Sequence, residues 1–151
     1  MTNPMPIDSL TAEKLLAENA ALRESERRLR TLADNLPGVV LYQIAGDTSG
    51  NRRFTYISES ARNVLGLSVE EVLTDARTVY AQLLPEYLPG LFAAEERSVR
   101  DNGTFNYEFQ IRRPSGDVRW ISLSASVCML PDGSGAGDGI LTDITARKKA
   151  G

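Results

Sequence analysis

Histidine is absent from this chain of 151 residues, and cysteine occurs once. Without histidine, the chain can build neither a Ser-His-Asp nor a Cys-His nucleophile system, and it has no imidazole ligand for zinc or haem. The single cysteine, Cys128, excludes an internal disulfide and fits a reducing compartment. Cys128 stands in a strand-like run, which predicts a small buried hydrophobe and not a reactive thiol.

Long apolar runs and an excess of positive charge are also missing. No stretch approaches the length that spans a membrane, and the N-terminus lacks the basic start and apolar run of a signal peptide. The net charge of −3 argues against nucleic acid as a partner. With no histidine and no clustered catalytic carboxylates, the sequence predicts a cytoplasmic protein that is not an enzyme and inserts no segment into a membrane.

What is present suffices for one domain. Apolar residues make up 42% of the chain, enough for a real core plus an appended element. We expect a flexible N-terminus at residues 1–9, an amphipathic helix at 10–36, a globular α+β domain at 37–145 and the start of another helix at 146–151.

The expected first helix carries a leucine every seven residues, at Leu15, Leu22, Leu29 and Leu36. With these leucines at heptad position d, Asn19 falls at a, where a single asparagine favours a two-stranded parallel coiled coil. The pattern therefore predicts a homodimer. Glu26, also at a, fits that seam poorly, so an amphipathic helix that packs on its own domain through Leu32 and Leu36 stays open.

Short helices and strands follow in a simple order. Two β-prone runs, 39–43 and 53–57, flank a turn and predict a hairpin. Ser58 is expected to cap a short helix that ends at Gly66, and Ser68 with Glu71 forms a capping box for a second. A third helix is expected at 89–100, with Asn102 and Gly103 as its stop. Its expected apolar face consists of Leu88, Leu91, Phe92 and Val99.

Three strands close the chain. Residues 105–111 and 118–130 alternate apolar and polar side chains around a turn at 114–117. Residues 131–138 are rich in glycine and are expected to form a flexible loop before a last strand at 139–142. No helix N-terminus follows this loop to hold an anion, so a phosphate site is not expected there.

The last strand runs directly into the expected basic helix. Thr145 is a suitable N-cap, because its hydroxyl can accept a free backbone N–H of the first helical turn. Asp143 lies four residues before Arg147, within reach of a local ion pair. We expect this junction to connect the sheet rigidly to whatever follows.

The element order, the hairpin at 112–120 and the ending Gly-Ile-Leu-Thr-Asp-Ile-Thr at 139–145 resemble a PAS domain with its PAC segment, over roughly residues 32–149. The resemblance implies a five-stranded antiparallel sheet of order 2-1-5-4-3, with short helices over one face enclosing a cavity. It also implies a sensory role in signalling proteins such as histidine kinases and diguanylate cyclases. Asp143 and Thr145 match the family's Asp-Ile-Thr junction, and Arg147 lies in the output helix that follows and leads to a C-terminal effector domain.

The resemblance narrows the choice of cofactor. Flavin-adduct members carry a cysteine on a central helix, and the corresponding residues 78–84 have none. Haem members typically use a histidine, which this chain lacks. No cofactor is therefore predicted, while a non-covalent flavin and a small apolar ligand both remain compatible with the sequence.

The inward-facing strand positions of the family imply a candidate ligand pocket here. The alternative is that the same side chains fill a dry core at ordinary density. Trp120 is expected on the opposite face of the sheet, against the N-terminal helix or a second subunit. The candidate pocket residues are Tyr56, Leu65, Leu84, Phe92, Tyr107, Phe109, Ile111, Ile121, Leu123, Ala125 and Leu141.

These features lead to three hypotheses about function. The first is a sensory module that dimerises and drives an effector, with or without a small apolar ligand. The second is a dimerisation or protein-interaction module that holds no ligand. The third is a sensor with a non-covalent flavin, which a yellow purified protein would identify.

Overall fold

The computed structural model describes residues 9–150 and divides the chain into two compact units, residues 1–32 and 33–151. The first unit consists of most of helix α1 (Ser9–Asn35). No glycine or proline interrupts this helix, and Glu24 forms ion pairs with Arg27 (3.3 Å) and Arg28 (3.4 Å) one turn further on. The helix predicted at 10–36 is confirmed.

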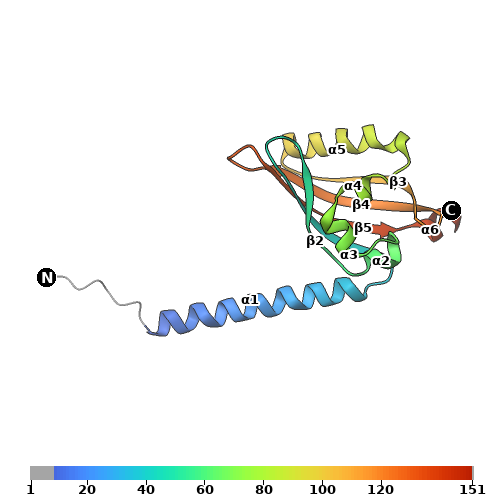
Figure 1. The fold of residues 1–151 in the computed structure, drawn as a ribbon. Coiled ribbons are helices and arrows are strands. Elements are labelled where there is room, and N and C mark those ends of the chain that lie inside the picture. The colour runs from blue at the N-terminus through green and yellow to red at the C-terminus, as the bar shows by residue number, and fades with distance from the viewer. Residues whose placement is uncertain (1–8, 151) are drawn as a thin grey trace. The chain divides into compact units, whose positions relative to one another are not determined.

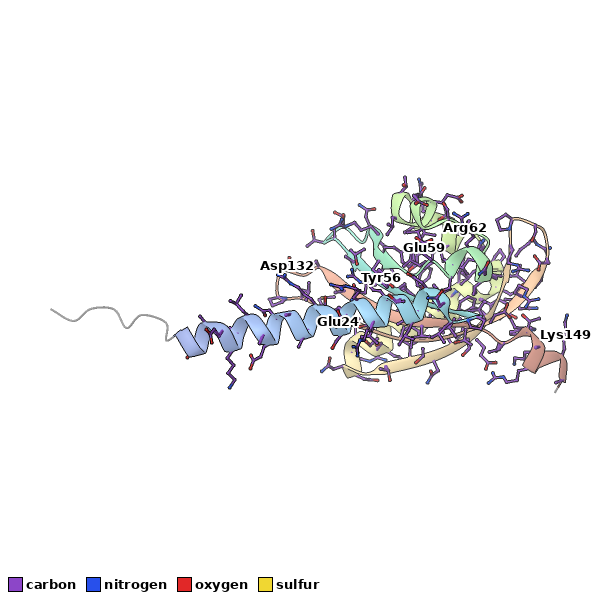
Figure 2. The ribbon with its side chains drawn as sticks, turned by 90° about the horizontal axis from the view of Figure 1, so that it is seen from below. Glu24, Tyr56, Glu59, Arg62, Asp132 and Lys149 are labelled. Atoms are coloured by element: carbon purple, nitrogen blue, oxygen red, sulfur yellow. The ribbon has the colours of Figure 1, made fainter. Side chains whose placement is uncertain are left out.

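The second unit contains a five-stranded antiparallel sheet in the order β2-β1-β5-β4-β3, as the sequence predicted (Figure 1). Helix α5 (Leu88–Asp101) lies over one face of the sheet, and helix α6 (Thr145–Ala150) lies at the end of the sheet opposite the β1–β2 and β4–β5 turns. Figure 2 shows the same separation from another side, with Asp132 of the β4–β5 turn and Lys149 of α6 at opposite ends. The strands are β1 (Val39–Gly46), β2 (Arg52–Ile57), β3 (Thr104–Arg112), β4 (Val118–Met129) and β5 (Gly135–Asp143).

The glycine-rich segment before the last strand differs from its prediction as a loop. Strand β5 begins at Gly135 and pairs on both sides, so that Gly137 lies between Ile44 of β1 and Val127 of β4. Because the neighbouring strands supply both hydrogen bonds and side chains, glycine is tolerated in this central strand. Only the tight turn around Gly133, which has a φ of +87°, remains outside the sheet.

Local capping chemistry accounts for several of the helix ends. The backbone N–H of Glu71 donates to Ser68 Oγ (3.1 Å), which confirms Ser68 as the N-cap of α3 (Val69–Thr74). Helix α5 (Leu88–Asp101) ends, as predicted, where Asn102 adopts a left-handed conformation. The prediction for Ser58 was wrong: its hydroxyl is buried, accepts the Leu41 N–H (3.0 Å) and bonds to Ser60 Oγ (2.7 Å).

Two further short helical segments were not predicted. They are α4 (Arg77–Tyr80) and the 3₁₀ segment η1 (Pro85–Tyr87), which follow α2 (Ala61–Val64) and α3. Between them, residues 82–84 run along the outer side of β3. Gln82 O accepts the Arg112 N–H (2.8 Å), and the Leu84 N–H donates to Gln110 O (3.1 Å). The buried Gln82 amide also donates to Leu65 O (2.7 Å), which fixes this segment to α2.

The core lies between the helices and the inner face of the sheet. Ile121 and Val40 are fully buried there, and Val72 of α3 closes it from the helical side. The inner face of α5 differs from its prediction: Leu91, Ala94, Glu95 and Ser98 are buried, whereas Phe92 is 46% exposed.

The second unit begins at Ala33, within the last turn of α1. Ala33 is buried, and Asp34 Oδ1 accepts the backbone N–H of Glu59 (2.7 Å). Leu36, a predicted domain contact, is 45% exposed, whereas Ala33 and Asp34 contact the rest of the second unit, to which they belong.

The prediction for Cys128 has a clear outcome. Cys128 is exposed, because it lies near the end of β4 on the outer face of the sheet, so the expectation of a buried side chain was wrong. Within residues 9–150, no helix is both long and apolar enough to cross a membrane.

Candidate functional site

A cavity of about 320 Å³ opens at the end of the sheet that carries the β1–β2 and β4–β5 turns. Glycines in β5 make room for it: a Cβ atom on Gly139 would lie 2.6 Å from Tyr42 Oη, and one on Gly137 would lie 3.3 Å from Ile44 Cγ2. Tyr42 and Ile44 can therefore lie across β5 on the inner face. This volume is within the range of small-molecule sites.

The polar groups of the cavity gather around Arg52 of β2. Arg52 Nη1 lies 2.5 Å from Glu95 Oε2 of α5 and donates to Tyr80 Oη of α4 (3.0 Å). The guanidinium carbon is 5.7 Å from the Tyr80 ring centroid and 5.5 Å from that of Phe92, both within the range of a cation–π contact. Arg52 thus connects β2 with both α4 and α5.

Burial dominates the electrostatics of this cluster. It raises the pKa of Glu95, and the charge of Arg52 offsets only part of that rise. Burial likewise raises the pKa values of Tyr80 and Tyr42, so both phenols stay neutral at pH 7. The cavity therefore combines one ion pair, two neutral hydroxyls and aromatic walls.

The sequence analysis did not identify this cluster. One signal was available: Leu91, Glu95 and Ser98 follow helical spacing, which puts Glu95 on the buried face of α5. A carboxylate at such a position needs a partner, and Arg52 is 43 positions away in the sequence.

The residues predicted to line a pocket lie elsewhere. Tyr56 and Leu84 are partly buried, Phe92 is exposed, and Tyr107 donates its hydroxyl to Tyr87 O (2.8 Å). None of the eleven lines the cavity described above, so a ligand held by them stays a prediction. The other seven lie together in the buried core: Leu65, Phe109, Ile111, Ile121, Leu123, Ala125 and Leu141.

The junction before α6 (Thr145–Ala150) is built around Asp143. Asp143 Oδ1 accepts the backbone N–H of Thr145 (3.0 Å) and its hydroxyl (2.6 Å), while Oδ2 accepts Arg119 Nε (2.9 Å). Only 11% of the Asp143 side chain is exposed. Burial alone would raise the pKa of Asp143, but the bonds from Thr145 and Arg119 outweigh it and hold that pKa below its usual value.

The sequence predicted Thr145 as the N-cap of this helix, but Asp143 takes that role in part. Thr145 Oγ1 accepts the backbone N–H of Trp120 (2.9 Å), so it connects the helix start to β4 and does not cap its own helix. Asp143 accepts the first-turn N–H instead. The Ile144 N–H also donates to Trp120 O (2.9 Å), so both backbone groups of Trp120 bond to the strand-to-helix turn.

Arg147 also has a different partner from the one predicted. Its Nη2 lies 2.8 Å from Glu108 Oε2 of β3, and Lys148 Nζ lies 2.7 Å from Glu108 Oε1. Lys148 also lies over the Trp120 ring, 4.6 Å from its centroid, and the edge of Tyr87 packs on the same ring. Three strands therefore hold the first turn and a half of α6, with Trp120 serving as a contact within one chain.

A pH prediction follows from the lowered pKa of Asp143. A carboxyl whose pKa is lowered by folding stabilises the fold above its unfolded value, and this contribution is lost as the pH falls through the folded value. We expect Asp143→Asn to be less stable than the wild type at pH 7, with the difference shrinking below about pH 4. Urea unfolding at both pH values measures it.

Asp101→Asn, at an exposed site in the last turn of α5, is the matched control for loss of one negative charge. Its stability should stay near that of the wild type at both pH values. An Asp143→Asn deficit that keeps the same size in acid would contradict the assignment of the ionised carboxylate as the stabilising form.

Comparison with known proteins agrees with this architecture. The sequence model of the PAS fold family matches residues 54–135, more than half of the chain. The chain belongs to the PAS fold family. No curated protein matches the sequence.

Solved structures from several organisms share this fold. A sensory box histidine kinase/response regulator from Burkholderia thailandensis is 21% identical, with a TM-score of 0.59 over 80% of this chain and 87% of that one. The N-terminal domain of a diguanylate cyclase with PAS/PAC sensor from Marinobacter aquaeolei is 15% identical, with a TM-score of 0.59 over 73% and 98%. A PAS domain from Colwellia psychrerythraea is 17% identical, with a TM-score of 0.61 over 80% and 98%.

At these identities the comparisons establish the fold alone.

Among residues 9–150, no group of three or more Cys, Asp or Glu side chains is placed to hold a metal ion.

Proposed function

We propose that this chain is the sensory and regulatory module of a signalling protein, that it forms a homodimer, and that it passes a signal through α6 to a C-terminal effector domain. The effector is of the histidine kinase or diguanylate cyclase type, which are the classes named for two of the structural neighbours. The module itself performs no catalysis.

One observation carries this proposal: the start of α6 is held by side chains from three strands. Asp143 of β5 and Arg119 of β4 form a partly buried ion pair, and Glu108 of β3 binds the basic residues of the helix. A displacement of the sheet therefore changes the position of the first helical turn. Such a connection suits the transmission of a state, because it offers a direct physical path from the sheet to whatever follows α6.

The test joins residues 1–151 in continuous helical register to a diguanylate cyclase domain and measures cyclic-dinucleotide synthesis. Asp143→Ala and Thr145→Val each remove hydrogen bonds at the junction and should lower domain stability by only about 0.5–2 kcal/mol. Cyclase output should nevertheless change several-fold in both variants, because the helix start loses its attachment to β4.

Ser124→Ala, at an exposed position on β4, is the control and should leave output unchanged. Unchanged output in both junction variants, with the domain folded and dimeric, would mean that Asp143 and Thr145 act only as a helix cap.

The input of this module is a small ligand in the cavity beside Arg52. The volume of about 320 Å³ and the mixture of aromatic walls with a few polar groups support this part of the proposal. Native mass spectrometry of the purified chain tests whether a small molecule is retained.

A further inference from the structure

Glu95 has an unusual position for a carboxylate. The residue is 8% exposed, lies on the inner face of α5 and borders the cavity. Its buried Oε2 meets Arg52 at 2.5 Å as an ion pair, but no donor among the described residues approaches it with hydrogen-bond geometry. A carboxylate accepts about four hydrogen bonds, so Oε2 keeps accepting capacity for a donor on a ligand.

The surroundings of Glu95 already hold a cation, which is Arg52 itself. Its guanidinium lies against the faces of Tyr80 and Phe92 and beside the Glu95 carboxylate. Aromatic faces carry negative electrostatic potential and attract cations. Tyr42 and Phe105 add further aromatic surface to the same cavity.

The charge of the cavity lining favours a cation over an anion. The ionisable side chains that carry charge in the lining are Arg52, Glu95 and Asp47, one cation against two carboxylates. An anion that approached Arg52 would also meet the adjacent carboxylate of Glu95. An ammonium group would instead be attracted by the Glu95 carboxylate. It would be repelled by the Arg52 guanidinium, which it would replace.

Arg52 is the more exposed member of the ion pair. Its side chain is 36% exposed and that of Glu95 only 11%, so the guanidinium can turn toward water, giving up its contacts with Glu95 and Tyr80, more readily than the carboxylate can. The pair is thus asymmetric: the cation can be exchanged and the carboxylate is fixed.

We propose that the cavity binds a small organic cation, an amine with an apolar body, whose ammonium group pairs with Glu95 in place of Arg52. The inference rests on the proposed sensory function and specifies the ligand class for that cavity. Binding would also release Arg52 from Tyr80 and Glu95, which undoes the connection between β2 and helices α4 and α5. Replacement of Arg52 by the ligand's ammonium group would thereby change how α4 and α5 are attached to β2.

The test is calorimetric titration of the folded chain with benzylamine and phenethylamine, using benzyl alcohol and benzoate as a neutral and an anionic probe of similar size. The amines should bind, and the alcohol and benzoate should bind at least about tenfold more weakly, since they cannot form the charge-assisted bond to Glu95. Benzoate binding as tightly as benzylamine would overturn the proposal.

Variants assign the effect to the two residues. Glu95→Gln keeps the size of the side chain and should weaken amine binding at least about tenfold. Glu96→Gln, at the exposed neighbouring position, should leave it unchanged. Arg52→Gln removes the competing cation and should tighten amine binding, and weaker binding in this variant would contradict the exchange.

Melting curves establish that each variant is folded. If Glu95→Gln does not fold, the probe series and Arg52→Gln still decide the proposal. Amine binding together with junction variants that leave cyclase output unchanged would refute signal transmission and retain the ligand class. If the amines do not bind but output depends on the junction as expected, the ligand class is refuted and signal transmission is retained.

Discussion

Replacing Leu22 and Leu29 with glutamate is expected to convert the proposed dimer into a folded monomer. The two leucines are 59% and 63% exposed on α1, and each occupies heptad position d with Leu15. In a single helix such a leucine stripe stays exposed to water, and pairing with a second copy would bury it. Two charges in that seam should weaken dimerisation at least about a hundredfold, which sedimentation velocity measures.

Ala17→Glu with Ala20→Glu is the matched control, because it adds the same two charges to the same helix at positions f and b, away from the seam. This control should remain a dimer. If the Leu22 and Leu29 variant sediments as the same dimer, the seam is not the interface, and the sheet face around Trp120 becomes the next surface to test with Trp120→Ala.

The second large effect is expected in the core. Ile121→Ala should lower the free energy of unfolding by about 2–5 kcal/mol, because the fully buried side chain leaves a void that its neighbours cannot fill. Ile140→Ala removes the same atoms from the adjacent strand β5, where 42% of the side chain is exposed, and should cost about 1 kcal/mol or less. Urea unfolding of both variants gives the comparison.

This pair of variants also tests the pocket predicted from the family resemblance. If Ile121 lines space that belongs to a ligand, its truncation in the ligand-free chain should cost no more than that of Ile140. A large difference between the two costs supports a dry core at Ile121 and leaves the cavity beside Arg52 as the ligand site.

Those elements whose determinants are local in sequence were predicted well. The N-cap at Ser68 and the stop at Asn102 depend on residues within one helical turn, and both were found. Helix α4 was missed because its four residues, Arg77–Tyr80, are too few to show a period. The glycines of β5 indicated a loop, since nothing local reveals that strands from both sides will pair with them.

The candidate functional residues show the same limit more clearly. The sequence predicted Asp143, Thr145 and Arg147 as residues of the strand-to-helix junction, but it assigned their partners within one turn. The structure pairs Asp143 with Arg119 and Arg147 with Glu108, which are 24 and 39 positions away. The Arg52–Glu95 pair has a similar separation, and only the assembled sheet and helix bring its members together.

The short segment along the outer side of β3 has a consequence for assembly. An exposed sheet edge is a template on which a foreign strand can polymerise, and proteins commonly block such edges. Here Gln82 and Leu84 already occupy backbone groups of Arg112 and Gln110, and the anchored Gln82 amide holds them in place. A strand from another molecule would have to displace residues 82–84 before it could pair with β3 at Gln110 and Arg112. The segment therefore protects the domain against edge-to-edge aggregation.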